Sequence, residues 1–507
     1  MYLKNLFLYR NFSSVIIFFT IILSLGFILR LNYLNEDIPL TLDSFRYFLL
    51  SMDISILGNL PVGYDKPNIG WSLFLGIIFQ IFSSGNYLDY MAIQRICAVI
   101  FSVFTAIPIY FLAEKFFKKE IAMVGVCFFV FSPYVIENSV LGLTDPLFIF
   151  LVISFLALIF SKKKINIVFS FIVLGFSTFV RYESVILIIP SVIIFLFKYK
   201  QEFNIQKYIL VGLVLFLLVV TSTSIWKNEL GMEHGITSQL SSGASTVVNE
   251  NSFNSETKDR FDVFRGIFNF LKYFGASLLP LCFIFIPYSI VSLLKKQNSD
   301  FRYLVWFGVV ASVPAFYAYG RGFEEVRYMF FIFPVLIISA LFLIEKLDLK
   351  MKRKNLIPII LMVLIISSSA IYVDFRQPNN EYEIEAIQVA KFVSNLPGKI
   401  NDYGPESYYV EVMDLEDYEL PILSSEIQFK KRVVNVSGET IEDILKNYKD
   451  KQISYLGITE QSMKNNQVLK EIFYEEKYTF FNKIYDSKDD LKEFNIKIFE
   501  INYERVQ

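Results

Sequence analysis

Four short polar segments hold the residues of this chain that are best suited to chemistry. Three of them contain Asp43, Asp145 and Arg181, and the fourth, residues 320–328, contains two acids and two arginines. A carboxylate can accept a proton from a substrate hydroxyl. A guanidinium can bind a phosphate through two charge-assisted hydrogen bonds. These residue types therefore predict acid–base chemistry beside a phosphate group.

Several other chemistries are disfavoured by composition. The chain has one histidine, His234, among 507 residues. Metal hydrolases and Ser-His or Cys-His enzymes need imidazole as a ligand or base, so any general base here is expected to be a carboxylate. No metal site is indicated, and a net charge of -1 gives no reason to expect a nucleic-acid partner.

Each candidate also has a purely structural interpretation. Asp43 and Asp145 stand where a helix could begin, and an aspartate there commonly caps the helix. Pro146 after Asp145 strengthens that alternative, because proline is favoured in the first helical turn. Arg181 and Glu183 could form an interfacial ion pair. The crowding of charge in residues 320–328 is harder to explain in this way.

These segments are separated by long apolar stretches. Hydrophobic residues make up 54% of the chain and charged residues only 19%, which indicates a membrane protein. The pattern predicts an all-α polytopic domain with about eleven transmembrane helices, several of them shorter than ~20 residues. The expected spans are residues 11–31, 91–113, 121–136, 146–160, 165–180, 185–197, 208–226, 270–294, 303–319, 328–344 and 356–373.

Connecting loops sort by charge. Lysine-rich connectors alternate with those that contain the acids and arginines above, and the basic set marks the cytoplasm. This holds only if the apolar run Ile69–Phe82 does not cross, so we expect it to be re-entrant or interfacial, with Trp71 at the water boundary. The N-terminus is then cytoplasmic, and the candidate residues share the external face of a cell membrane.

Two polar regions interrupt this pattern. Residues 374–507 mix helical and strand-like segments and predict a small external α/β domain after a membrane domain of residues 1–373. Helix is expected at 383–396, and strands at 452–458 and 494–501. Residues 32–90 form the first external loop, and residues 228–262, rich in Ser, Asn and Gly, predict a mobile external loop.

A series of polar motifs follows one order along the chain: Asp43, Lys66-Pro67, Arg95, Leu112 to Phe117, Ser132-Pro133, Leu143 to Leu147, Arg181 to Glu183, Glu325 to Tyr328 and Pro334. Their order resembles that of the GT-C membrane glycosyltransferases. Within that superfamily, the similarity is to the branch of dolichyl-phosphate-mannose protein mannosyltransferases and lipid A aminoarabinose transferase, over about residues 10–345. Ser44 stands where the mannosyltransferase pattern has a second acid, and the oligosaccharyltransferase signature Trp-Trp-Asp-Tyr-Gly is absent.

The resemblance implies a sugar donor linked to a polyprenyl phosphate and a catalytic acid at Asp43. We expect inverting transfer of a hexosyl or pentosyl group to a protein, lipid or glycan acceptor, with Asp43 as base and Asp145 as a second catalytic residue that either orients the acceptor or supports Asp43. Arg327 and Arg181 are the expected phosphate-binding residues. No cofactor is indicated, and use of a divalent metal stays open. Supporting roles fall to Glu325, Glu324, Lys66 and Tyr328.

Two other classes fit the same composition. A transporter of a lipid-linked or small polar substrate would also contain charges near the membrane, although transporters more often show paired repeats and helices broken at the midplane. A noncatalytic membrane scaffold that presents the C-terminal domain would need no clustered acids. Transfer, uptake or neither, measured with a labelled polyprenyl-phosphate sugar, separates the three.

Overall fold

The computed structural model describes most of the chain, and all structural statements below refer to that part. It comprises residues 2–36, 38–40, 42–61, 68–82, 87–161, 163–198, 203–229, 261–277, 291, 299–351, 355–376, 380–413, 432–435, 438, 440–463, 466–475, 478–489 and 493–505. The predicted mobile loop 228–262 therefore lies almost wholly outside the described residues, as does Lys66.

The chain divides into two compact units. The first comprises Met1–Leu34, Thr41–Ile81 and Ile93–Gln377, and the second comprises Asn35–Leu40, Phe82–Ala92 and Pro378–Gln507. Two short segments of the predicted first external loop thus belong to the same unit as the C-terminal region, where Ile38 joins a hydrophobic core around Ala386 and Ile498.

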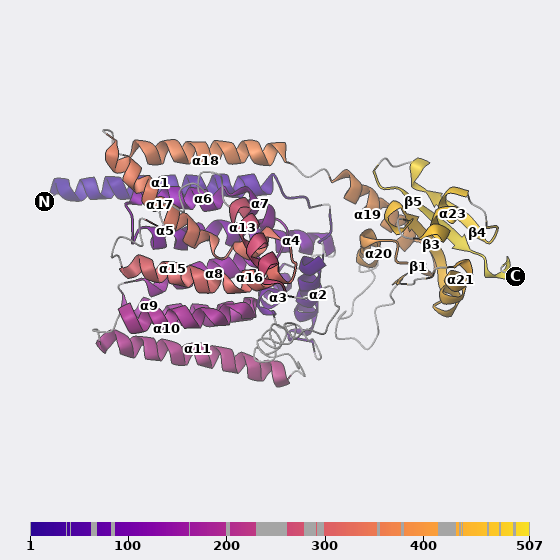
Figure 1. Cartoon of the computed structure of the whole chain (residues 1–507), viewed down its shortest axis with the longest axis horizontal. Coiled ribbons are helices and arrows are strands. Elements are labelled where there is room, and N and C mark those ends of the chain that lie inside the picture. Colours follow the sequence, from indigo (N-terminus) through magenta and orange to yellow (C-terminus); the bar gives the residue numbers. More distant parts are fainter. Residues whose placement is uncertain are drawn as a thin grey trace. The chain divides into compact units, whose positions relative to one another are not determined.

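Helices make up the first unit, and long apolar runs explain why. In Figure 1 the long helices of this unit run in roughly one direction, with α2 and α3 across one end. Its elements are α1 (Tyr2–Leu31), α2 (Leu42–Leu57), α3 (Gly70–Ile81), α4 (Tyr87–Phe104), α5 (Ala106–Ala113), α6 (Lys119–Val130), α7 (Pro133–Ser139), α8 (Asp145–Ile159), α9 (Lys164–Val180), η1 (Tyr182–Leu187), α10 (Ile188–Lys198), α11 (Phe203–Glu229), α13 (Val263–Ser277), α15 (Ser299–Ala311), α16 (Val313–Gly320), η2 (Val326–Met329), α17 (Phe333–Lys350) and α18 (Leu356–Phe375).

Exposed apolar side chains show that this unit is suited to lipid. On α11, Leu210, Leu217 and Leu218 are each more than half exposed, whereas α8 is buried among its neighbours. Four described helical segments are long and apolar enough to cross a membrane, or five if α6 and α7 count as one span. The four are Tyr87–Ala113, Gln206–Trp226, Asp300–Gly320 and Leu356–Phe375. The count of about eleven spans stays a prediction. Of five shorter apolar helices, four overlap expected spans, and the fifth, Gly70–Ile81, is the run expected not to cross.

One expected helix is broken. The sequence predicts a single span over residues 121–136, but α6 ends at Val130 and α7 begins at Pro133, with a bend of 54° between them. Proline has no N–H to continue the helical hydrogen bonds, and its ring excludes a straight path. The bend turns α7 away from the direction of α6.

The run Ile69–Phe82 forms the short helix α3. Its twelve residues extend about 18 Å, which is too short to cross the ~30 Å core of a bilayer alone. The position of Trp71 at the water boundary stays a prediction, and its side chain is buried within the protein, with 0% exposed. Its indole N–H donates to Gly142 O at 3.1 Å, so α3 is held against the turn before α8.

The second unit contains a five-stranded sheet in the order β2-β1-β3-β5-β4. The β1–β2 and β1–β3 pairs are parallel, and β5 is antiparallel to both β3 and β4. The helix and strands expected at 383–396, 452–458 and 494–501 correspond to α19, β3 and β5. The elements are α19 (Glu381–Ser394), β1 (Lys399–Asn401), η3 (Pro405–Ser407), α20 (Tyr408–Met413), β2 (Val433–Val434), α21 (Ile441–Asp450), β3 (Ile453–Thr459), α22 (Glu460–Met463), α23 (Gln467–Glu475), β4 (Phe481–Asp486), η5 (Ser487–Asp489), β5 (Ile496–Ile501) and η6 (Tyr503–Arg505).

Candidate active site

Asp43 lies in the first turn of α2, and a buried amide fixes that turn. The Gln94 side chain on α4 donates to Ser44 O at 2.9 Å and to Gly142 O at 2.8 Å. Gly142 has a φ of 71°, a conformation that glycine adopts at little cost. Gln94 therefore joins the start of α2 to the turn that precedes α8, and so brings the segments of Asp43 and Asp145 together.

Arg327 contacts two other predicted residues, Asp43 and Glu325. Its Nη2 donates to Asp43 Oδ2 at 3.2 Å, and its guanidinium also forms an ion pair with Glu325. Arg327 is 22% exposed, whereas the side chains of Asp43 and Glu325 are 47% and 50% exposed. The carboxylate of Asp43 thus binds an arginine that is 284 residues away in the sequence and is partly open to solvent.

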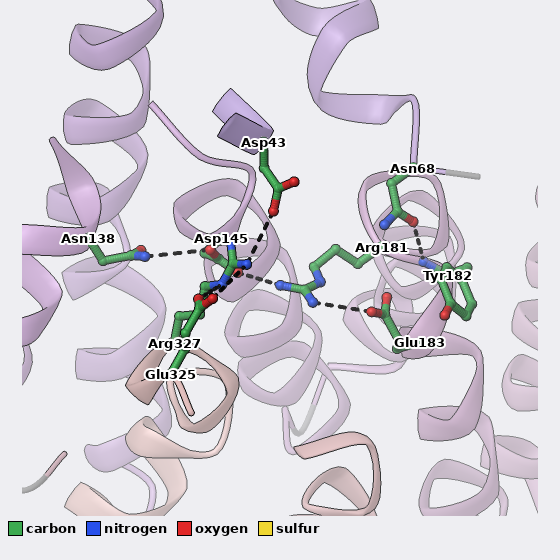
Figure 2. Close-up of polar contacts among 9 residues, drawn as sticks. All are labelled: Asp43, Asn68, Asn138, Asp145, Arg181, Tyr182, Glu183, Glu325 and Arg327. Atoms are coloured by element: carbon green, nitrogen blue, oxygen red, sulfur yellow. Dashed lines mark hydrogen bonds and ion pairs between the residues drawn. The ribbon is translucent and has the colours of Figure 1, made fainter. Parts of the chain in front are cut away.

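Asp145 is held in a more enclosed environment. It forms an ion pair with Arg181, whose Nη2 reaches Glu183 Oε1 at 3.2 Å. Asn138 on α7 donates to Asp145 Oδ2 at 3.5 Å, the long end of the hydrogen-bond range. With its side chain 4% exposed, Asp145 is committed to these partners. Figure 2 shows Arg327, Arg181 and Asn138 converging around this carboxylate, with Asp43 beside Arg327.

The turn that carries Arg181 is fixed from α3. The backbone N–H of Tyr182 donates to Asn68 Oδ1 at 3.1 Å. Gly70, two residues after Asn68, packs closely against the end of α9. An added Cβ there would lie 2.8 Å from backbone atoms of Phe179 and Val180. The absence of a side chain at Gly70 therefore allows α3 to reach the end of α9.

Both arginines keep their charge. Burial by itself would lower the pKa of Arg181, but Glu183 and Asp145 outweigh it and raise that pKa. Burial likewise opposes the charge of Arg327, and the carboxylates of Asp145 and Glu325 raise its pKa. Burial, together with the charges of Asp145 and Asp43, raises the pKa of Tyr47 on α2 to about 12, so its phenol stays neutral.

Two cavities meet at Arg327. The first, of about 190 Å³, is lined by Asp145, Arg181 and Arg327 and otherwise mainly by apolar and aromatic side chains. The second, of about 460 Å³, is lined by Asp43, Glu325, Arg327 and Asn138 among others. Arg327 faces both cavities, whereas Asp145 lines only the first and Asp43 only the second.

The other predicted residues have different positions. Tyr328 lines the first cavity, with its ring 5.6 Å from the Arg327 guanidinium. Glu324 does not join the network, because its carboxylate pairs with Lys272 at 3.2 Å and accepts from Tyr273. Sequence reasoning did not single out Asn138, Tyr47 or Gln94, since neutral side chains inside apolar helices gave no charge signal.

This arrangement separates two chemical roles. Asp43 is partly exposed beside a cavity and can accept a proton, while Asp145 orients Arg181 and helps maintain positive charge next to the first cavity. Neither acid caps its helix through a described hydrogen bond, since their carboxylates bind arginine and asparagine side chains. Within the described residues, no group of three or more His, Cys, Asp or Glu side chains could hold a metal ion.

Comparison with known proteins identifies the fold. Residues 65–226 match the family model described as dolichyl-phosphate-mannose-protein mannosyltransferase. ArnT from Cupriavidus metallidurans bound to undecaprenyl phosphate aligns with a TM-score of 0.58 at 11% identity, over 96% of this chain and 98% of its own. The chain has the GT-C fold. The resemblance to GT-C glycosyltransferases seen in the polar motifs is thereby confirmed.

Archaeal GT-C structures show the same similarity. The apo oligosaccharyltransferase of Archaeoglobus fulgidus aligns with a TM-score of 0.59 at 12% identity, over 93% of this chain and 72% of its own. AglB from the same organism, in complex with an inhibitory peptide and a dolichol-phosphate, aligns with a TM-score of 0.54 at 11% identity, over 92% of this chain and 72% of its own. A search of curated protein sequences gives no significant match. The family-model match contains Asp145 and Arg181, while Asp43 and Arg327 lie outside it.

Proposed function

We propose that this GT-C chain is an inverting glycosyltransferase that moves a sugar from a polyprenyl-phosphate donor to an acceptor hydroxyl. The observation that carries the proposal is Arg327, which binds the candidate base Asp43 and lines both cavities. An arginine in that position can interact with a donor phosphate while the base faces the acceptor. Single-displacement transfer requires both roles, a cation at the leaving phosphate and a base at the acceptor hydroxyl.

The first cavity suits the donor. Its aromatic and aliphatic lining matches the start of a polyprenyl chain, and Arg181 and Arg327 supply positive charge for the phosphate. The comparison structures support this assignment, because ArnT contains undecaprenyl phosphate and AglB contains a dolichol-phosphate. Both arginines pair with two carboxylates, but Arg181 is held by the buried Asp145, whereas the partners of Arg327 are about half exposed. Arg327 is therefore the principal phosphate ligand in this proposal.

The second cavity then takes the acceptor beside Asp43. In the reaction, the acceptor oxygen attacks the anomeric carbon, the bond from that carbon to the phosphate oxygen breaks, and the hydroxyl proton passes to Asp43. The leaving polyprenyl phosphate departs with the bonding electrons and is stabilised by Arg327. Because a phosphate is already a good leaving group, one carboxylate is sufficient, and a single displacement inverts the anomeric centre.

We place this reaction on the external face of the cell membrane. The distribution of lysine-rich connectors supports that side, with a cytoplasmic N-terminus and an external domain over residues 374–507. The acceptor in this proposal is a protein, lipid or glycan of the cell envelope. The external domain is available to bind it or to cover the site.

Comparative glycan analysis of living cells tests the proposal. Mass spectrometry of proteins, lipids and envelope glycans is compared among cells with the wild-type protein, cells that lack it and cells with Asp43→Asn. Loss of one sugar substituent in both altered strains is expected, and it would name the sugar and the acceptor together. Identical glycans in all three strains would contradict a transferase role.

A further inference from the structure

Arg30 is a fully buried arginine in an apolar helix, and the proposed chemistry makes no use of it. It lies near the end of α1 and is 0% exposed. An ionised side chain in a membrane-spanning helix is costly unless it has partners, so its presence suggests that it has a structural or functional role. Every partner of Arg30 among the described residues is a carbonyl or a hydroxyl, and none is a carboxylate.

One of these partners is the carbonyl that the α6–α7 bend leaves open. In a continuous helix, Val130 O would accept from the N–H of residue 134, but the chain turns at Pro133. Arg30 Nη1 donates to Val130 O at 2.9 Å and to Gly26 O at 2.8 Å. An unpaired carbonyl in an apolar interior would be unfavourable, so Arg30 stabilises the bent form.

The same guanidinium also holds the far end of α7. Arg30 Nε donates to Ser139 Oγ at 3.1 Å, and the Ser139 hydroxyl donates onward to Ile136 O at 2.7 Å. Arg30 Nη2 donates to Ser102 Oγ on α4 at 3.2 Å. Ser102 and Ser139 are both buried. One side chain thus ties α1 and α4 to the last residue of α6 and to the last residue of the seven-residue helix α7.

A glycine permits this contact. At Gly26, one turn before Arg30, an added Cβ would lie 2.2 Å from Val130 Cγ1. The lack of a side chain lets α1 approach the end of α6 closely enough for Arg30 to donate to Val130 O.

The segment held in this way carries site residues. Asn138, next to Ser139, donates to Asp145, and Glu137 and Asn138 line the cavity that contains Asp43. We propose that Arg30 is a positioning residue for transfer, which sets α7 and thereby the Asn138–Asp145 contact and the wall of the Asp43 cavity. This inference rests on the proposed function.

The test measures steady-state transfer by Arg30→Met and Arg30→Lys proteins, with Arg302→Met as the matched control. Arg302 is an exposed arginine on α15. Both Arg30 variants are expected to lose about 10- to 100-fold in kcat, because misplacement of site residues by about 1 Å costs that much. KM for the donor should change little, since Arg181 and Arg327 are untouched. Arg302→Met should transfer normally.

A double-mutant cycle separates positioning from general stability. If Arg30 acts through α7, Asn138→Ala should cost far less activity in the Arg30→Met background than in the wild type. Fully additive losses would overturn the inference. So would wild-type kcat in Arg30→Met. If Arg30→Met does not accumulate, the cycle is run with Ser139→Ala, which removes only one of the hydrogen bonds. Absence of transfer by the wild-type protein would instead contradict the proposed function itself.

Discussion

At the scale of single residues, the two candidate acids differ in solvent exposure and in the number of their partners. Asp43 is half exposed and has one arginine partner, whereas Asp145 is almost fully buried and is bound by Arg181 and Asn138. A general base must exchange a proton with a substrate, while an orienting acid only needs to keep its partners in place. This contrast favours Asp43 as the base.

Replacing Asp43 by Asn tests that assignment. The substitution keeps size and hydrogen bonding but removes proton acceptance, so turnover should fall roughly 100-fold or more, with donor binding retained. Asp262 is the matched control, because its carboxylate caps α13 through the N–H groups of Phe264 and Arg265. Asp262→Asn should cost at most ~1 kcal/mol of stability and leave turnover intact. Near-normal transfer by Asp43→Asn would move the base to Asp145 or Glu325.

The two arginines should respond differently to loss of charge. Arg181→Met leaves the buried Asp145 without its cation and should destabilise the fold by about 3–5 kcal/mol. The partners of Arg327 are about half exposed and can be hydrated, so Arg327→Met should change stability by only ~0–1 kcal/mol.

The loss of turnover on substitution of Arg327 should be large, although its loss of stability is small. Arg327→Met should lower kcat by about 100- to 1000-fold, the usual cost of removing one electrostatic stabiliser of the transition state. Arg327→Lys should restore little of it, because an ammonium group cannot form the two-pronged contact with phosphate. Thermal denaturation in detergent and donor-saturated rates provide both measurements. Equal stability losses for Arg181→Met and Arg327→Met would contradict the structural distinction.

The charged members of this site could be predicted from the sequence, and the neutral ones could not. Asp43, Asp145, Arg181 and Arg327 stand out because charge is rare in apolar surroundings. Asn138, Gln94 and Tyr47 have no such signal, and only tertiary packing shows that they contact or surround the acids. Glu324 has the same residue type as Glu325, but it points to Lys272 instead.

At the scale of elements, short irregular segments position the site. The first turn of α2, the turn before α8 and the end of α9 meet through Gln94, Trp71 and Asn68. Long helices were predictable from apolar runs, but their breaks were less so. At the bend before Pro133, the carbonyl of Val130 accepts a hydrogen bond from Arg30, a contact that periodicity alone does not reveal.

Gly70 tests the contact between α3 and the end of α9. Its Cα hydrogen faces backbone atoms that cannot rotate away, so Gly70→Ala should cost about 1–3 kcal/mol and displace the turn of Arg181. Gly125→Ala is the control, because the nearest atom at that position is the end of the Leu341 side chain, which can shift. Thermal denaturation of the two proteins gives the comparison. A Gly70→Ala protein as stable and active as Gly125→Ala would show that the close approach is unimportant.

At the scale of the whole molecule, the proposed function requires that the candidate site residues lie on the same side of the membrane. The lysine-rich connectors predict that tags at Gln507 and within residues 241–245 are both external. Membrane-impermeant reagents applied from outside should therefore reach both tags, while Lys163 and Lys352 should be labelled only after the membrane is opened. A cytoplasmic tag at Gln507 would mean that α3 and its flanks cross the membrane or that another span is miscounted.

Transfer itself is the most direct test of the central claim. Membranes from cells lacking the protein supply the acceptor, and purified wild-type or Asp43→Asn protein is added with a panel of radiolabelled polyprenyl-phosphate hexoses and pentoses. The account predicts that wild-type protein moves label from one donor into acceptor and releases polyprenyl phosphate, and that Asp43→Asn does so at roughly one hundredth of the rate or less. Label that enters sealed vesicles without changing its chemical form, or label that stays on the donor with every member of the panel, would contradict it.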